Sequence, residues 1–449
     1  MTRGITKLLI CVICCSLPLV GAWADGAVYA MTNALGANQV LVYHRADDGT
    51  LSLIQTIGTG GGGGGLQLST VDSLGSQGSL KLDEAHHRLF AVNTETLAAN
   101  SPGDCQEGTI TSFLVAPDGS LTLADRVLSG GLYPNSLTFK STKDGPGKNE
   151  ALRSRVVGDL LYVLNAGGPG LSPACGTGPK ITGFTVDRAG TMSFLPGSVQ
   201  AINPGALAGT GSGVNCPPGG FSPVASYYCG LNPPAFPRSP GEVRFTPDGD
   251  QLVVTVKGTN SIYVFPVGKR GTVGSPRVTQ APGPALPTYF GFAFDDEDDM
   301  ILTEAFGRST SIPASGTGAV SSFTITRSGV LRQISASIAD FGTAACWVAL
   351  EPTTGRYAYI SNNLSNNIST YSVRKDGRLT LLAAEAASVN GPNDLAVVGE
   401  GRASFLYVLD SGDGTVGASQ IDQRNGSLTS LGAIGGLPAN AGAGGLAAY

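Results

Sequence analysis

Three carboxylic acids in this chain stand where they could act as acid or base groups: Glu242, Glu304 and Asp394. Each lies at one end of a short apolar run of the kind that forms a β-strand. A carboxylate that faces a low-dielectric channel can have a raised pKa, and it can then exchange a proton or hold a hard cation together with amide oxygens. We therefore take Glu304 and Glu242 as the candidate catalytic residues.

Basic and aromatic residues occur at neighbouring strand ends. An arginine or lysine there could hold an anionic group or stabilise a developing oxyanion, while a carboxylate takes the proton of an attacking water. This chemistry would need no histidine. The candidate substrate-binding residues are Arg238, Lys257, Arg308, Tyr289, Trp347 and Asp394.

The three histidines argue against other kinds of site. His44 ends a predicted strand, and His86 and His87 fall at a predicted turn, so all three are expected where the tight turns lie. A Ser-His-Asp triad, a Cys-His pair or a histidine zinc site is therefore not expected among the long loops. We interpret His86 and His87 as a solvated turn. The sequence indicates no cofactor and no set of metal ligands, and it leaves a divalent cation such as calcium open.

A repeated pattern of short strands must position these residues. The run that gives the second strand of each unit occurs seven times, as in LFAVN (89–93), LYVLN (161–165) and LYVLD (406–410). A glycine turn follows each copy further on, as in DDGTLSL, PDGSLTL and KDGRLTL. With 65 glycines, 27 prolines and no long stretch of helical period, the chain is expected to be all-β. Seven four-stranded antiparallel units predict a seven-bladed β-propeller.

The two ends of the chain predict how the ring closes. The last residues, AGAGGLAAY (441–449), match a first strand that has no second strand after it. At the other end, GAVYAMTN (26–33) matches a second strand that has no first strand before it. We therefore expect residues 444–449 to pair with residues 27–33 in one blade.

Turns and loops divide between the two ends of the predicted ring. In an antiparallel meander the first-to-second and third-to-fourth turns lie at the same end, which we name the tight-turn face. Most of these turns are short, and the connection at 140–158 is the long exception. The opposite end, the long-loop face, carries nearly all the long segments: 58–75, 94–108, 166–179, 196–241, 281–289 and 305–318. Since long loops on a rigid scaffold usually carry binding sites, we expect the site on the long-loop face, around the central channel.

The first residues match a secretory signal peptide. Two basic residues precede an apolar run from Leu8 to Val20, and residues 22–24 offer a cleavage site. We expect residues 1–24 to be removed and residues 25–449 to form the propeller, as a monomer that is secreted or periplasmic. The apolar run is short for a membrane span, and no other segment could form one. The formal net charge of −5 argues against a nucleic acid or an anionic membrane as a partner.

Cysteine usage fits export. Cys216 and Cys229 bracket a proline-rich insertion that needs a staple, so we expect a disulfide between them. Cys105 and Cys175 occupy corresponding loops of neighbouring blades and form the second predicted disulfide. Cys346 lies in an apolar run and is expected to be a buried, free thiol.

Four motifs carry a resemblance to a known family: LGSQGSLKLD (74–83), SGGLYPNSLTF (129–139), ACWVALEPTTGRYAYISNN (345–363) and GGLAAY (444–449). With the repeats, they resemble the lactonase-type seven-bladed propellers, a family that includes 6-phosphogluconolactonase and the carboxymuconate cyclases, and most closely its secreted branch. The resemblance implies a seven-bladed ring with a ligand site on one face near the axis. The histidine-bearing motifs of the phosphogluconolactonase members and the His and Arg set of the cyclases have no counterpart here.

Two functions from different classes remain open. The first is an enzyme that hydrolyses or closes a lactone, with Glu304 or Glu242 as the acid or base and the candidate cations on an anionic group. The second is a secreted ring without catalysis that binds a carbohydrate or a protein partner on the same face. The scarcity of histidine favours the second, and the clustering of acids and bases in adjacent blades favours the first.

Overall fold

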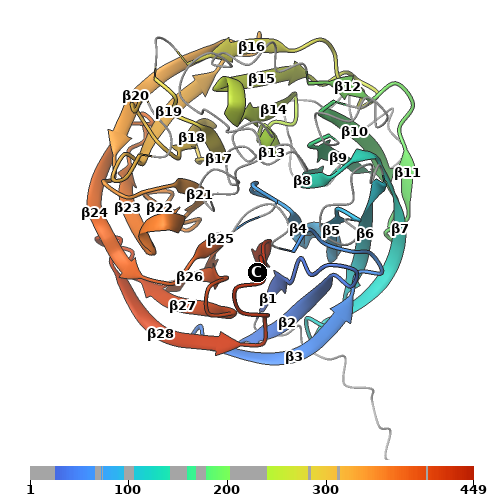
Figure 1. The fold of residues 1–449 in the computed structure, drawn as a ribbon, viewed down its shortest axis with the longest axis horizontal. Coiled ribbons are helices and arrows are strands. Elements are labelled where there is room, and N and C mark those ends of the chain that lie inside the picture. Colours follow the sequence, from blue (N-terminus) through green and yellow to red (C-terminus); the bar gives the residue numbers. More distant parts are fainter. Residues whose placement is uncertain are drawn as a thin grey trace, which may run out of the picture.

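The computed structural model describes residues 26–65, 72, 74–95, 106–141, 159–167, 178–202, 240–281, 285–310, 314–400 and 403–449. Within these ranges the chain forms seven antiparallel β-sheets arranged as a ring around a central axis (Figure 1). The predicted all-β, seven-bladed propeller is confirmed.

Each blade is a meander whose first strand lies nearest the axis and whose fourth strand lies at the rim (Figure 1). Blade one consists of β29 (Leu446–Ala448), β1 (Ala27–Met31), β2 (Gln39–Arg45) and β3 (Leu51–Gly58), and blade two of β4 (Leu80–Asp83), β5 (Arg88–Asn93), β6 (Glu107–Val115) and β7 (Leu121–Leu132). Blade three consists of β8 (Pro134–Lys140), β9 (Asp159–Asn165), β10 (Lys180–Val186) and β11 (Met192–Phe194), and the short β12 (Gln200–Ala201) also pairs with β10. Blade four consists of β13 (Pro240–Phe245), β14 (Gln251–Val256), β15 (Ser261–Pro266) and β16 (Arg277–Gln280). Blade five consists of β17 (Tyr289–Phe294), β18 (Asp299–Glu304), β19 (Ala319–Ile325) and β20 (Leu331–Ala339). Blade six consists of β21 (Ala345–Leu350), β22 (Tyr357–Asn362), β23 (Asn367–Val373) and β24 (Leu379–Ser388). Blade seven consists of β25 (Pro392–Glu400), β26 (Ala403–Asp410), β27 (Thr415–Ile421) and β28 (Leu428–Gly435). Short 3₁₀ turns, η1 (Glu84–His86), η2 (Lys257–Thr259) and η3 (Asn363–Ser365), complete the elements.

The second strands are apolar because they lie inside a sheet that packs against a neighbouring blade on each side. Every residue of β5, β9, β14 and β22 is buried. The fourth strands face solvent in large part, as the exposed Leu53 and Ile54 of β3 illustrate. The hydrophobic core therefore lies between neighbouring blades.

Ring closure occurs as predicted. The last strand, β29, is the innermost strand of blade one, where Tyr29 pairs with Ala447 and Val28 with Ala448. The backbone N–H of Ala27 donates to the Tyr449 carbonyl at 3.2 Å. The first and last strands of the described chain thus share one sheet.

Tyrosine hydroxyls tie neighbouring blades together. Four tyrosines on second strands donate to a glycine carbonyl in the third-to-fourth turn of the next blade: Tyr29 to Gly119 at 2.9 Å, Tyr162 to Gly271 at 2.7 Å, Tyr359 to Gly426 at 3.0 Å and Tyr407 to Gly49 at 3.0 Å. At Gly271, φ is +80° and a Cβ would lie 2.5 Å from a Leu160 methyl carbon, so both conformation and space require glycine. The repeated glycine turns therefore also serve as docking points between blades.

Parts of our sequence predictions fall on residues beyond those described. These are the signal peptide (1–24), Arg238 and the four cysteines of the two predicted disulfides, Cys105, Cys175, Cys216 and Cys229. Cys346 is a buried, free thiol, as predicted. Among the described residues, no helix combines the length and apolarity that a bilayer crossing requires.

Candidate functional site

A short segment between β3 and β4 crosses the central axis. We name residues 74–79 the axial segment. Its backbone N–H of Gln77 donates to Gly241 in blade four at 3.0 Å. Two carbonyls of the segment accept from other blades. The Gly78 carbonyl accepts from the backbone N–H of Leu137 in blade three at 2.8 Å, and the Ser79 carbonyl accepts from that of Val92 in blade two at 3.1 Å.

Blade six holds the axial segment from across the ring. The indole N–H of Trp347 donates to the Ser76 carbonyl at 2.9 Å, and the Gln77 side chain bonds both backbone groups of Val348, at 2.8 and 3.2 Å. Because these partners lie on opposite sides of the axis, the segment closes the long-loop end of the channel.

Lys257 and Trp347, two predicted binding residues, meet at the axial segment. The Lys257 ammonium donates to the Gly75 carbonyl and lies 4.8 Å from the centre of the Phe290 ring, on which Trp347 also packs at 5.0 Å. Both side chains are buried. Burial lowers the pKa of Lys257 to about 7. These residues therefore hold the segment in place.

Glu304 lies inside blade five. One carboxylate oxygen accepts from the Ser321 hydroxyl, and the other accepts from Ser337 at 2.6 Å. Burial raises the pKa of Glu304, and these hydroxyls oppose the rise. Tyr289 pairs with Glu304 in the adjacent strand, while the exposed Arg308 guanidinium donates to the Ala336 carbonyl at 3.0 Å. Both carboxylate oxygens of Glu304 are thus satisfied within its own blade.

A cavity of about 350 Å³ lies on the axis beneath the axial segment, and its wall comes from the innermost strands of six blades. Its floor includes Gln77, Gly78 and Asp394. Its rim carries Glu84 and Asp296, which are exposed residues of tight turns. The cavity thus opens at the tight-turn face, the end opposite to the one that we expected, because the axial segment fills the long-loop end.

Arg244 supplies a guanidinium group to this cavity, and Glu242 forms an ion pair with it. Two guanidinium nitrogens of Arg244 donate to one carboxylate oxygen of Glu242, each at 2.7 Å. The other oxygen of Glu242 accepts from the backbone N–H of Phe292 at 2.6 Å. Burial raises the pKa of Glu242, and the charge of Arg244 opposes that rise. Glu242 therefore positions Arg244 from below.

Asp394 is the carboxyl group that lines the cavity floor. Its oxygens accept from the backbone N–H groups of Leu395 at 2.8 Å and Leu446 at 2.9 Å. Burial raises its pKa to about 8, although both N–H donors favour the ionised form. A carboxyl group in this state can accept a proton at mildly alkaline pH.

Lys81, on β4, supplies a second cation to the cavity. Burial lowers its pKa to about 8, and the charge of Arg244 adds to this effect, while Glu242, Glu84 and Asp394 oppose it. None of the described residues accepts a hydrogen bond from the Lys81 ammonium. Lys81 is therefore available to a ligand.

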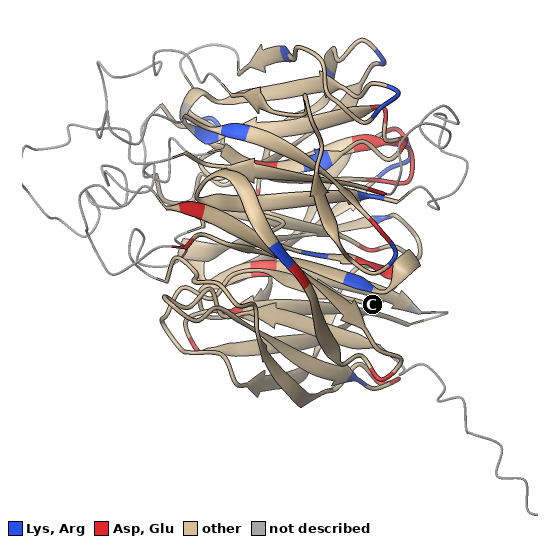
Figure 2. Ribbon diagram, turned by 90° about the vertical axis from the view of Figure 1, so that its right-hand side faces the viewer, with Lys and Arg blue, Asp and Glu red and all other residues tan. Residues whose placement is uncertain are grey.

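Charged residues of the tight turns gather at one end of the ring, on the right of Figure 2. Near the cavity mouth they are mainly acidic, with Asp295, Asp296 and Glu351 beside Glu84. Burial raises the pKa of Asp295 to about 6. Glu351 accepts instead from the backbone N–H groups of Thr353 and Thr354, at 2.9 and 2.8 Å, and so orders its own turn.

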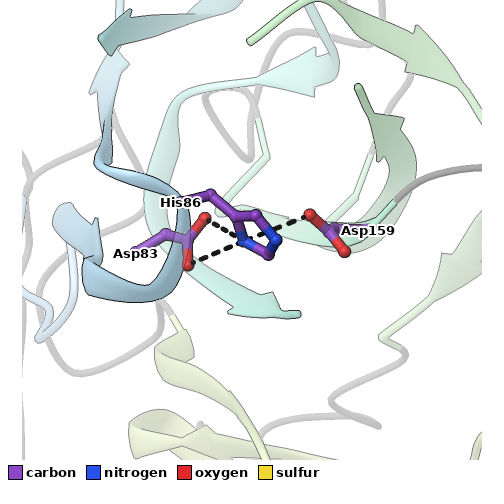
Figure 3. A group of neighbouring side chains, drawn as sticks. All are labelled: Asp83, His86 and Asp159. Carbon is purple, nitrogen blue, oxygen red and sulfur yellow. Dashed lines mark hydrogen bonds and ion pairs between the residues drawn. The ribbon is translucent and has the colours of Figure 1, made fainter. Parts of the chain in front are cut away.

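A second cluster joins blades two and three on the same face (Figure 3). The Nδ1 atom of His86 lies 3.1 Å from Asp83 and 3.5 Å from Asp159, an arrangement that could hold a metal ion. Arg88, however, donates to both carboxylates and already pairs with them. We interpret the cluster as a tie between blades. The expectation that His86 is solvated was wrong, because its side chain is only 8% exposed, whereas His87 is exposed.

Sequence reasoning found Glu242 and Asp394 but missed Lys81 and Arg244. Arg244 follows Glu242 by two residues, and side chains at that spacing share a face of a strand, so the Glu-x-Arg spacing was a usable signal. Lys81 lies within the motif LGSQGSLKLD, but its place beside Asp394 depends on contacts across the ring.

Comparisons with known proteins give related folds. A family model described as "Lactonase, 7-bladed beta-propeller" matches residues 317–439. A periplasmic gluconolactonase from Pseudomonas aeruginosa is 16% identical over 94% of this chain and 99% of its own, with a TM-score of 0.61. A candidate 6-phosphogluconolactonase from Bacteroides fragilis is 15% identical over 95% of this chain and 98% of its own, with a TM-score of 0.60. No curated protein matches the chain in sequence.

Proposed function

We propose that this chain, which resembles the lactonase-type seven-bladed propellers in fold over almost its whole length and in sequence over residues 317–439, hydrolyses a lactone in its central cavity. The observation that carries the proposal is the meeting of Asp394 and Arg244 in one cavity that opens at the tight-turn face. A carboxyl group with a raised pKa and a fixed guanidinium supply the two functions that attack of water on a carbonyl requires.

Asp394 acts as the general base in this mechanism. Its carboxylate takes a proton from a water molecule as the water oxygen forms a bond to the lactone carbonyl carbon. The guanidinium of Arg244 donates hydrogen bonds to the carbonyl oxygen, on which negative charge develops. Glu242 acts through Arg244 as a positioning residue, since its ion pair fixes the guanidinium. The intermediate then opens to a hydroxy acid.

We test this function with wild type and three variants on a panel of aliphatic, aromatic and sugar lactones. Asp394→Asn should lower kcat/KM by about 10²- to 10⁴-fold, the usual cost of losing a general base. Glu304→Gln examines the acid that the sequence favoured, and retained activity there would remove Glu304 from the reaction. The exposed Glu385→Gln is the matched control for loss of a carboxylate.

Two results would contradict the proposal. Full activity of Asp394→Asn would show that Asp394 is not the general base. No hydrolysis by wild type across the panel, with or without Ca²⁺, would favour the alternative of a ring without catalysis that binds a carbohydrate or a protein partner.

We also propose that the protein is exported, secreted or periplasmic, after removal of residues 1–24. The composition of that segment supports this, as set out above. N-terminal sequencing of the mature protein from an expressing host should begin at Asp25, and an intact Met1 in the exported fraction would contradict it.

A further inference from the structure

We propose that Lys81 is a further catalytic residue, which donates a proton to the ring oxygen when the lactone opens. This role rests on the function proposed above. Asp394 and Arg244 account for the attack of water, and Lys81 would account for protonation of the leaving oxygen. Attack of water needs a base and an oxyanion donor, whereas departure of an alkoxide needs an acid.

The state of the other polar groups in the cavity points to Lys81. Glu242 and Arg244 are joined in an ion pair, and both oxygens of Asp394 accept backbone N–H groups. Gln77 is bonded to Val348 through both ends of its amide. Lys81 alone among these residues has a charged group with no hydrogen-bond partner, and it lines the same cavity.

The surroundings of Lys81 suit proton transfer near neutral pH. The charged groups that act on it are Arg244 and Glu242 on β13, Glu84 on η1 and Asp394 on β25. Burial together with the charge of Arg244 lowers the pKa of Lys81 to about 8, which makes its ammonium a stronger acid than that of an exposed lysine. Lys81 lies in β4, directly after the axial segment. The hydrogen bonds of that segment to neighbouring blades hold the start of β4 at the cavity floor.

After water has added and Asp394 has taken its proton, the bond between the carbonyl carbon and the ring oxygen breaks. The Lys81 ammonium gives its proton to that oxygen, so the product leaves as an alcohol and Lys81 becomes a neutral amine. The proton held by Asp394 and the one lost by Lys81 are then exchanged with solvent through the open mouth of the cavity.

The test compares two leaving groups in Lys81→Met and Lys81→Arg. An aliphatic lactone releases an alkoxide that needs a proton, whereas an aryl lactone releases a phenolate that leaves unaided. We expect Lys81→Met to lower kcat/KM for the aliphatic lactone by about 10²- to 10⁴-fold and for the aryl lactone by less than ~10-fold. Lys81→Arg keeps the charge without an acid of suitable pKa and should show the same contrast.

The pH profile gives an independent readout. Since Lys81 must be protonated, the wild-type rate on the aliphatic lactone should fall as pH rises above about 8, and this fall should be absent with the aryl lactone. Lys140→Met is the matched control, because Lys140 also lies on an innermost strand but its bond to Pro247 is exposed.

The outcomes separate this proposal from the function it rests on. If wild type hydrolyses neither lactone, the proposed function fails. If wild type hydrolyses both and Lys81→Met slows both equally, or neither, the function stands and the role of Lys81 is overturned. Thermal unfolding of each variant identifies a loss of fold, and Lys81→Arg then decides the question.

Discussion

At the scale of single residues, position along a strand predicted which acids lie near the axis but not which way they point. Glu242 and Asp394 follow the start of innermost strands and reach the cavity floor or its support. Glu304 ends a second strand, where its carboxylate turns into the blade toward Ser321 and Ser337. Side chains alternate between the two faces of a strand, so a strand end alone does not fix the direction.

The raised pKa of Asp394 predicts how stability changes with pH. Its folded pKa of about 8 lies above the unfolded value near 3.9, so the folded protein binds the proton more tightly between these values. Above about pH 4 Asp394 ionises in the unfolded chain but stays protonated in the folded protein up to about pH 8. Stability therefore falls over this range, by at most about 1.4 kcal/mol per pH unit.

Urea unfolding at pH 5 and pH 8 measures this contribution. Wild type should lose more stability between the two pH values than Asp394→Asn, which cannot ionise. An equal loss in both proteins would show that Asp394 does not titrate in this range.

At the scale of elements, local turn chemistry predicted the strands, while the ties between blades needed the structure. The glycine turns were visible in the sequence, but the tyrosine that bonds each turn comes from the preceding blade. Removing the hydroxyl in Tyr162→Phe should cost about 1 kcal/mol of unfolding free energy, because the buried Gly271 carbonyl loses its donor. Tyr357→Phe is the control, and equal effects of the two changes in denaturant unfolding would contradict the role of the tie.

The axial segment gives a second prediction at this scale. Lys257→Met removes the ammonium that donates to the buried Gly75 carbonyl, so it should destabilise the protein by ~2 kcal/mol. Lys140→Met changes a half-buried residue whose hydrogen bond to Pro247 is exposed, so it should stay within about 0.5 kcal/mol of wild type. Chemical denaturation compares them, and a neutral Lys257→Met would mean that this bond does not hold the segment.

At the scale of the whole molecule, the ring was predictable because its signal is repeated and local. Closure followed from the match between residues 444–449 and the missing first strand. The open end of the channel was not predictable, because a single irregular segment at 74–79 decides it through contacts with blades two, three, four and six. The sequence-based rule that long loops carry the site therefore favoured the end that this segment closes.

Deleting residues 444–449 tests closure directly. Blade one should then lose hydrogen-exchange protection at Tyr29 and its neighbours on β1, since β29 is their inner partner. Unchanged protection in blade one would contradict the assignment of this strand to ring closure.

We propose above that a lactone binds and is opened in the axial cavity at the tight-turn face. A crystal structure of Asp394→Asn soaked with a lactone that wild type hydrolyses tests it most directly. We expect density for the lactone between Arg244 and Lys81, with its carbonyl oxygen toward the Arg244 guanidinium. Density at the long-loop face instead, beside Glu304 and Arg308, would contradict it.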